Sequence, residues 1–239
     1  MSRAVFDRSY YEANQQAGDR PALRWYARVC HRLMGGAEKE IFDFGCGTGW
    51  LMHHLVSYGH RVSGFDEGEY SRQSAGKLVP DSTLYDNLSV VPRGRYDLVV
   101  SLHVLEHVPD PEALVAQLAD LLKPNGHLMF VVPARNGLGH RIRGDEWFAF
   151  RDESHISLLE EREWRAIVRG SGMRIVQEAG DGLWDPPYVP WLPRWFQLAL
   201  FGSPAAVQVY LGRGRLFVPA AWSECLIVVA QSNEARPGD

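Results

Sequence analysis

Short apolar runs alternate with stretches of helical spacing along most of the chain. Six runs have the length of buried strands, and they cover residues 40–45, 61–66, 96–102, 127–133, 173–179 and 224–231. Between the first two, a predicted helix that ends at Gly59 has one apolar side, formed by Leu51, Met52, Leu55 and Val56. Because strand and helix patterns alternate, we predict an α/β protein with helices on both faces of a parallel sheet.

Two later helices have start signals in the sequence. Asp110 is suited to an N-cap and Pro111 to the first helical position, and we expect this helix to end at residues 124–126. Its predicted buried stripe consists of Leu114, Val115, Leu118, Leu121 and Leu122. Ser157 and Glu160 have the spacing of a capping box and predict the start of another helix.

The loop DFGCGTG (residues 43–49) follows the first strand and opens a helix. Its glycines allow tight turns and a close approach of the backbone to a ligand. Asp66 ends the second strand, where a carboxylate can accept hydrogen bonds from a ribose diol. Since ligands bind at the carboxyl ends of parallel strands, we expect a site at the loop, Asp66, Leu102 and His103. A dinucleotide loop would need a glycine where Trp50 stands, which disfavours NAD.

Four segments, IFDFGCGTG, GFD, YDLVVSLHVLEHVPDP and LLKPNGHLMFVVP, occur in this order within residues 40–179. In combination they resemble the class I S-adenosylmethionine-dependent methyltransferases, and most closely the branch that holds the quinone-biosynthesis O-methyltransferases. The resemblance implies a doubly wound, seven-stranded, mostly parallel Rossmann-like sheet whose last strand, ECLIVVAQ, is antiparallel. It also implies that S-adenosyl-L-methionine is the cofactor.

The resemblance further implies roles for single residues. The glycine loop would pass under the methionine part of the cofactor, with Asp43 organising the loop, and Asp66 would hold the ribose hydroxyls. Asp86 or Asn87 would lie near the adenine amine, although DSTLYDNLS around them departs from the family pattern. The residues expected at the cofactor are Asp43, Gly45, Cys46, Gly47, Asp66, Asp86, Asn87, Leu102 and His103. We interpret Cys46 as a packing residue rather than a nucleophile.

The segment SLHVLEHVPDP contains His103-x-x-Glu106-His107, the spacing of one class of zinc peptidases. Pro109 limits any helix through His107 to about one turn, which disfavours a peptidase. In the family this segment lines the pocket beside the methyl group, and some quinone methyltransferases bind a divalent ion there through Glu-x-x-Glu-His. His103 replaces the first glutamate here; we expect no metal, and we expect the Glu106 side chain to bond the backbone.

A hydroxyl acceptor would have to lose its proton, for which histidine is suited near neutral pH. The candidate bases are His107, His155 and His103. A loop hydrogen bond is an equal alternative for His155, which follows a segment whose Trp147 and Phe148 are expected to form pocket walls. Tyr10 and Tyr11 are expected either to cover the cofactor or to pack at the surface or in the core.

The segment of residues 181–221 is rich in tryptophan and proline, and residues 195–212 carry no charge. Its apolar halves are too short to span a bilayer, so we expect a packed helical hairpin or lid between the last two strands. We expect the segment to extend the core or to make a homodimer contact. The functional alternative is an apolar or lipid-linked acceptor, presented at a membrane surface by peripheral contact.

The composition of the chain indicates which classes of binding partner and which compartment to expect. A net charge of −4 without a run of Lys or Arg gives no support to a nucleic-acid partner, and three widely spaced cysteines suit a reducing compartment. With no signal-like N-terminus, we expect a cytoplasmic address. The expected parts are a helical cap (1–39), the cofactor-binding core (40–180), the insertion (181–221), a final strand (222–231) and a tail (232–239).

The sequence therefore predicts an S-adenosylmethionine-dependent methyltransferase that acts on a small-molecule acceptor, with a hydroxyl on an apolar or lipid-linked substrate as the expected target. An NAD-dependent oxidoreductase and a non-catalytic S-adenosylmethionine-binding protein are the alternatives.

Overall fold

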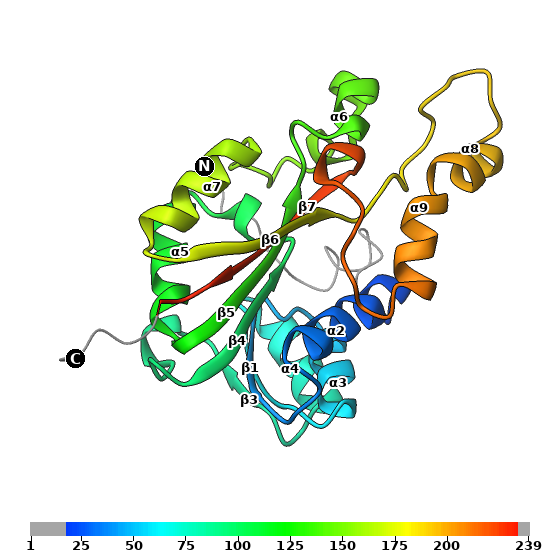
Figure 1. The fold of residues 1–239 in the computed structure, drawn as a ribbon. Helices are drawn as coiled ribbons and strands as arrows, with labels where there is room; N and C mark the ends of the chain where they lie inside the picture. The colour runs from blue at the N-terminus through cyan, green and yellow to red at the C-terminus, as the bar shows by residue number, and fades with distance from the viewer. Residues whose placement is uncertain (1–17, 234–239) are drawn as a thin grey trace.

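A computed structural model describes residues 18–233, whose strands form one sheet in the order β3-β2-β1-β4-β5-β7-β6 (Figure 1). The strands are β1 (Glu40–Phe44), β2 (Arg61–Phe65), β3 (Thr83–Tyr85), β4 (Tyr96–Leu102), β5 (Leu122–Pro133), β6 (Arg174–Gly180) and β7 (Cys225–Gln231). Only β7 runs antiparallel to its neighbours among the strands of this described part. The predicted doubly wound sheet, with its antiparallel last strand, is thus confirmed.

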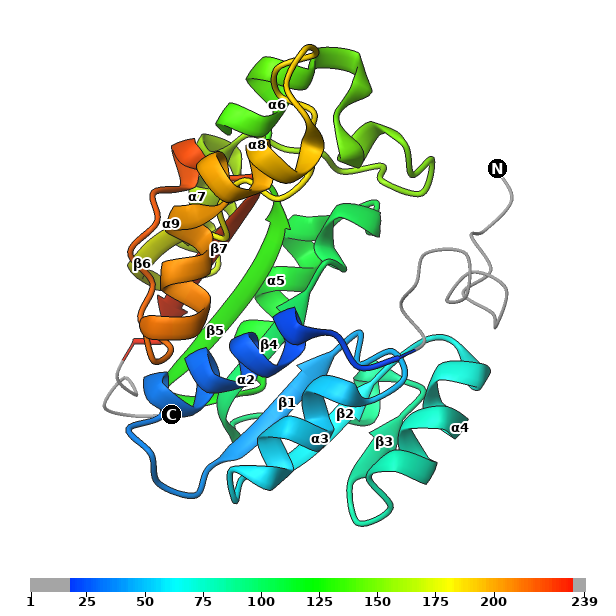
Figure 2. The same ribbon diagram turned by 90° about the vertical axis from the view of Figure 1, so that its right-hand side faces the viewer.

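Helices cover both faces of the sheet (Figures 1 and 2). The α-helices are α2 (Pro21–Leu33), α3 (Trp50–Ser57), α4 (Glu69–Leu78), α5 (Pro111–Asp120), α6 (Leu138–Arg143), α7 (Glu161–Gly170), α8 (Arg194–Phe201) and α9 (Ser203–Ala206). Short 3-10 turns are η1 (Leu88–Val90), η2 (Leu105–His107), η3 (Gly144–Glu146), η4 (Phe148–Phe150) and η6 (Ala220–Trp222), and η5 (Val207–Leu211) is a π-helical turn.

Alternation along the strands separates two apolar layers, because successive side chains point to opposite faces. Ile41 and Met129 pack with side chains of α2 and α3, whereas their neighbours Phe42 and Phe130 pack with those of α5 and α7. The cysteines Cys30, Cys46 and Cys225 are free and buried. Both faces of the central strands are therefore dry, which explains their nearly continuous apolar runs.

The predicted start of α5 is confirmed, because the Asp110 side chain accepts a hydrogen bond from the backbone N–H of Ala113 at 3.0 Å. Its predicted end is wrong: α5 stops at Asp120, and β5 already begins at Leu122, which pairs with Tyr96. The turn signal at residues 124–126 instead produces an irregularity within the strand, where Asn125 has a φ of 62°.

The capping box predicted at Ser157 and Glu160 is also wrong. Helix α7 begins at Glu161, and its capping box is formed by Glu160 and Glu163. The Ser157 hydroxyl donates to the carbonyl of Val108 at 2.6 Å and ties this segment to the loop after β4. Ser157 and Glu160 could each begin a helix. Because Ser157 is engaged in the contact with Val108, the helix begins after Glu160 instead.

Between β6 and β7 the chain forms α8, α9 and η5, which lie on the same side of the sheet as α2 (Figure 2). Two fully buried glutamines anchor this insertion. Gln197 bonds the backbone of the loop before α8, at Tyr188, Val189 and Leu192. Gln208 donates to the carbonyl of Gly180 and accepts from the N–H groups of Phe217 and Val218. Amide side chains thus satisfy backbone groups that the insertion would otherwise leave unpaired.

Glu224, just before β7, joins the insertion to the segment after β5. Its fully buried carboxylate accepts hydrogen bonds from Trp147 Nε1 at 2.8 Å and from the Tyr188 hydroxyl at 2.5 Å. Burial raises the pKa of Glu224 to about 7, although these two hydrogen bonds act to lower it. Trp147 is therefore buried in this junction, and the expectation that it forms a pocket wall is wrong.

Candidate active site

The glycine loop after β1 forms the floor of the site at the carboxyl edge of the sheet. Gly45, Gly47 and Gly49 have φ values of 75°, 52° and 87°, a left-handed region that other residues rarely adopt. A Cβ atom on Gly45 would collide with Val104, and one on Gly49 would lie 2.8 Å from the Cα of Ala75. The loop is therefore packed directly against the segment that follows β4.

Asp66, at the end of β2, holds this loop in place. One carboxylate oxygen accepts from the N–H of Gly47 at 2.9 Å, and the other accepts from the N–H of Gly68 at 2.8 Å. Burial raises the pKa of Asp66, and the hydrogen bonds from Gly68 and Gly47 counteract that rise. Asp66 thus organises the loop, a role that was expected of Asp43, whereas Asp66 itself was expected to contact the ribose.

Asp43 is buried, and its Oδ2 atom makes no hydrogen bond within residues 18–233. Burial, together with the charge of Asp66, raises the pKa of Asp43 to about 8. A buried carboxylate oxygen without a partner is unfavourable unless a proton or a cation complements it. Asp43 therefore fits a cofactor that carries a positive charge, such as a sulfonium or an ammonium group.

The remaining expected cofactor residues differ in how far they lie from the loop. Cys46 is buried in the loop itself, close to Gly64, and burial raises its thiol pKa, which agrees with a packing role. Leu102 is half-buried at the end of β4. Asp86 and Asn87 are exposed after β3, and the Asn87 side chain caps η1 by accepting from the N–H of Ser89 at 2.9 Å.

The segment after β4 is a single 3-10 turn, η2, so His103 and His107 do not share the face of an α-helix, as Pro109 predicts. His103 has a φ of 57°, and its Nδ1 atom lies 3.5 Å from Oε1 of Glu106. Glu106 is fully buried, and neither of its carboxylate oxygens makes a hydrogen bond within the described chain. The expectation that its side chain bonds the backbone is therefore wrong.

A relay orients His107. The Ser154 hydroxyl donates to Asp152 at 2.5 Å and can accept from Nδ1 of His107, 2.9 Å away, which is also 3.2 Å from the Ser154 carbonyl. These partners favour a proton on Nδ1 and leave Nε2 as the basic nitrogen. Burial lowers the pKa of His107, while the charge of Glu106 opposes that shift. The imidazole is consequently neutral at pH 7.

His155 lies beside His107, with ring centroids 4.7 Å apart. Its Nδ1 lies 2.7 Å from the carbonyl of Ala149, to which it must donate, and its Nε2 is 3.9 Å from Asp152. The predicted loop hydrogen bond is present. It leaves Nε2 of His155 without a proton, as an acceptor beside His107.

Glu106, His107 and His155 each offer one ligand atom within 4.8 Å of the others, so this group could hold a metal ion. One carboxylate and two imidazoles suit first-row transition metals, and an ion there would act as a Lewis acid on an acceptor oxygen. His103 is not part of the group. His155, which joins it from the loop before α7, was expected as a base or in a loop hydrogen bond, and not as a metal ligand.

Sequence reasoning missed Arg20. This half-buried residue caps the start of α2, its Nε atom has no hydrogen-bond partner in the described chain, and burial lowers its pKa. The preceding Asp19 lies 2.8 Å from Nε2 of His54 on α3, the helix that the glycine loop opens. Arg20 is thus a partly buried cation at the start of α2, and the residue before it contacts the helix that the glycine loop opens. Tyr10 and Tyr11 lie outside the described residues.

A family model described as a methyltransferase domain matches residues 17–178, which is most of the chain. The chain belongs to the S-adenosylmethionine-dependent methyltransferases. Its cofactor is S-adenosylmethionine, and neither NAD-dependent oxidation nor cofactor binding without catalysis is favoured by its relatives.

Curated relatives include the ubiquinone biosynthesis O-methyltransferase of Marinobacter nauticus, 32% identical over 57% of this chain and 60% of the relative. That of Serratia proteamaculans is 34% identical over 45% of this chain and 48% of the relative. The chain thus matches about half to three fifths of the length of these relatives.

Solved structures share the fold across nearly the whole chain. The magnesium protoporphyrin IX methyltransferase of Synechocystis PCC 6803 with bound SAH has a TM-score of 0.66 at 17% identity, covering 97% of this chain and 98% of that one. The 1,6-didemethyltoxoflavin-N1-methyltransferase of Burkholderia thailandensis has a TM-score of 0.57 at 16% identity, covering 95% and 85%.

Replacing Asp66 with alanine is expected to weaken S-adenosylmethionine binding by about 1–3 kcal/mol, because hydrogen bonds to a charged acceptor are lost. Gly47→Val should abolish binding, because the left-handed backbone would change and a side chain would enter the loop. Titration calorimetry measures both, with the exposed Asp81→Ala as a matched control. Wild-type affinity in both loop variants would remove this loop from the cofactor site.

Asp43 predicts a pH dependence of cofactor binding. Because its pKa is about 8 without a ligand and a cation favours the carboxylate, binding should release a proton below pH 8. Affinity should therefore increase from pH 6 to 7.5, by up to about tenfold per unit. Asp43→Asn should weaken cofactor binding and remove its dependence on pH. In the ligand-free protein, the same substitution should lessen the fall in the free energy of unfolding as pH rises toward 8. Calorimetry in two buffers of different ionisation enthalpy counts the protons, and a wild-type affinity that does not vary with pH would contradict this role.

Proposed function

We propose that the chain transfers the methyl group of S-adenosylmethionine to a hydroxyl of an apolar, quinone-related acceptor. The observation that carries the proposal is the half-buried pair His107 and His155, whose Nδ1 atoms both face oxygen partners. The names of the curated relatives support the acceptor class.

The bound cofactor supplies an activated methyl group, so the protein must align the acceptor and exclude water. His107 is our candidate general base, since its neutral imidazole can accept the hydroxyl proton at Nε2. The imidazolium that forms would be stabilised by the nearby carboxylates of Glu106 and Asp152, whose charges both raise the pKa of His107. His155 and His103 are the alternative bases.

Two charged residues each have one buried atom without a hydrogen-bond partner in the described chain, Oδ2 of Asp43 and Nε of Arg20. We assign the ammonium or sulfonium of the cofactor to the side of Asp43 and its carboxylate to Arg20 on this ground. Asp66 would bond the ribose hydroxyls while it continues to hold the loop. Asp86 and Asn87 remain our candidates for the adenine amine.

An apolar acceptor is favoured by the aromatic connection between the segment after β5 and the insertion. Phe148, on η4, contacts Trp184 of the insertion with ring centroids 4.9 Å apart. Arg143 donates to the carbonyl of Pro187 at 2.9 Å, which ties the same two segments together. The insertion is thus positioned to act as an apolar lid beside the catalytic histidines.

A phenolic acceptor with an isoprenoid tail should be methylated with a kcat/KM at least tenfold higher than its truncated, water-soluble analogue, because the apolar lid adds binding surface. The measurement is the release of S-adenosylhomocysteine with each acceptor, and Trp184→Ala should reduce the difference between them. The exposed Trp222→Ala is the matched control. Equal rates with both acceptors would refute the apolar acceptor, and no turnover with any phenol would refute O-methylation.

His107→Ala is expected to lower kcat by roughly 10²–10⁴ while cofactor affinity stays unchanged. Because burial lowers the pKa of His107, wild-type kcat/KM should fall only as pH drops below about 6.5, where the base gains a proton. His155→Ala and His103→Ala test the alternatives, and His127→Ala at the far end of β5 is the control. Near-wild-type turnover in all three site variants would favour a carbon or already ionised acceptor.

A further inference from the structure

The insertion exposes the apolar side chains that a helix normally buries. Gln197 is the one buried residue of α8, and Gln208 is the one buried residue of η5. We call the exposed set the apolar insertion surface, and it includes Trp191, Trp195, Leu198, Leu200, Tyr210 and Leu211. Trp195 is 71% exposed and Leu211 is 73% exposed, so most of each side chain is uncovered within residues 18–233. Large exposed apolar side chains that gather on one segment are typical of interaction sites.

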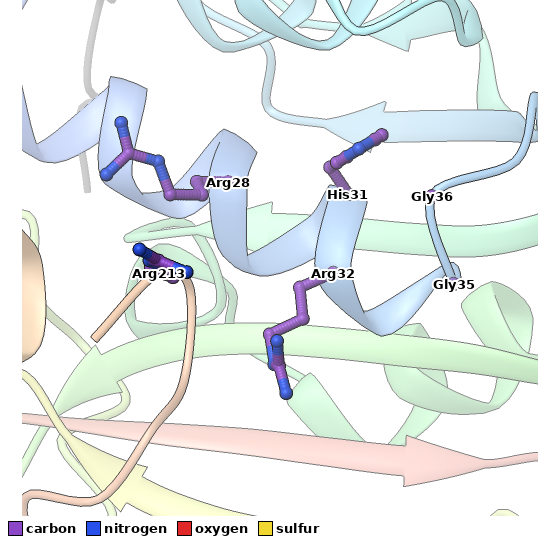
Figure 3. Close-up of a pocket in the computed structure, with 6 residues that line it drawn as sticks. All are labelled: Arg28, His31, Arg32, Gly35, Gly36 and Arg213. Atoms are coloured by element: carbon purple, nitrogen blue, oxygen red, sulfur yellow. The ribbon is translucent and has the colours of Figure 1, made fainter. Parts of the chain in front are cut away.

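A basic pocket lies next to this surface, between α2 and the turn that follows η5 (Figure 3). Arg28 and Arg32 of α2 and Arg213 of the turn line it, together with His31, Gly35 and Gly36. None of the three arginines takes part in an ion pair in the described part of the chain, where the paired arginines lie elsewhere. No carboxylate lines the pocket.

The fold brings these like charges together. Arg28 and Arg32 are four residues apart on α2, a spacing at which two cations repel each other. Arg213 reaches the same pocket because the backbone at Gly214 lies against α2, where an added Cβ would be 2.6 Å from the carbonyl oxygen of Arg28. The negative end of the α2 dipole stabilises the charge of Arg32 in its last turn. It does not explain why Arg213, from a different segment, lies at the same pocket. An anion in the pocket would be attracted by the unpaired arginines that line it.

We propose that the apolar insertion surface and the basic pocket dock together on an anionic phospholipid bilayer, with a headgroup phosphate in the pocket. Only Gly212 separates the exposed Leu211 from Arg213, so apolar insertion and phosphate binding can occur at one interface. Tryptophan and tyrosine favour the interfacial region, and guanidinium groups bind phosphate through paired hydrogen bonds. No helix in residues 18–233 is both long and apolar enough to cross a bilayer, which leaves docking on its surface.

Charge favours a bilayer over a second copy of this chain. Residues 195–212 carry no acidic side chain that could pair with the arginines of a partner copy. An anionic bilayer supplies both the apolar layer and the phosphates that the two features require. This proposal does not depend on the proposed acceptor, because its readout is vesicle binding rather than methyl transfer.

The test is flotation of the full chain with vesicles of phosphatidylcholine alone and of phosphatidylcholine with phosphatidylglycerol. Binding should require the anionic lipid and weaken with salt. Arg32→Gln and Arg213→Gln should each reduce binding by roughly fivefold, and the double variant Trp195→Ser, Leu211→Ser should abolish it. Matched controls on other surfaces are Arg169→Gln and Val90→Ser, which should bind as the wild type does.

Unchanged cofactor affinity and melting temperature establish that each variant is folded. Three results would overturn the proposal: vesicle binding that none of the variants alters, binding of inorganic phosphate to the pocket without any vesicle binding, or a dimer in solution that the Trp195→Ser, Leu211→Ser variant dissociates. The last result would assign the apolar insertion surface to a second copy of the chain.

Discussion

Burial of carboxylates at the carboxyl edge of the sheet is the constraint on which the site depends. Asp43, Asp66, Glu106 and Glu224 are all buried there or beside it. A buried carboxylate must accept hydrogen bonds, take up a proton or meet a cation. Asp66 and Glu224 follow the first course, since each accepts two hydrogen bonds and thereby fixes a loop or a junction.

Asp43 and Glu106 do not have all of their carboxylate oxygens hydrogen-bonded in the described chain. Asp43 keeps one oxygen without a hydrogen bond, and Glu106 keeps two. Such groups are unfavourable in the isolated protein and become favourable once a complementary charge arrives. Asp43 stands beside the glycine loop, and Glu106 stands beside His107. Their positions divide the site into a cofactor side and a proton-accepting side, which is the division that methyl transfer to a hydroxyl requires.

Local signals predicted the parts of the site that lie within one strand and its loop. The glycine loop, Asp66 and the N-cap at Asp110 each depend on a few consecutive residues, so sequence alone revealed them. The meeting of Glu106 with His155 could not be predicted, because it depends on how the segment after β5 folds back over the loop after β4. The contact from the Ser157 hydroxyl to the Val108 carbonyl is one of those that tie these segments together, and it also displaces the expected start of α7.

The insertion shows why an apolar composition alone did not predict its packing. Its uncharged sequence favoured a buried hairpin, yet α8 and η5 bury glutamines and expose aromatic and aliphatic side chains. A buried backbone group without a hydrogen bond costs more free energy than an apolar side chain left in contact with water. The amide of glutamine can both donate and accept, so it can satisfy N–H and C=O groups together. Once Gln197 and Gln208 occupy the inside of these turns, the apolar residues must face outward.

Helix α2 connects the two charged regions of the molecule. Arg20 lies at its start, next to Asp19, which contacts His54 on the helix after the glycine loop, whereas Arg28 and Arg32, in its second half, line the basic pocket. A helix of 13 residues spans roughly 20 Å, so the two regions are separate sites on one rigid element. The net charge of −4 does not reveal that the two regions differ in charge. The site contains buried acidic residues, whereas the pocket is lined by unpaired arginines. A cationic cofactor and an anionic surface can therefore be held at the same time, each by the charge that suits it.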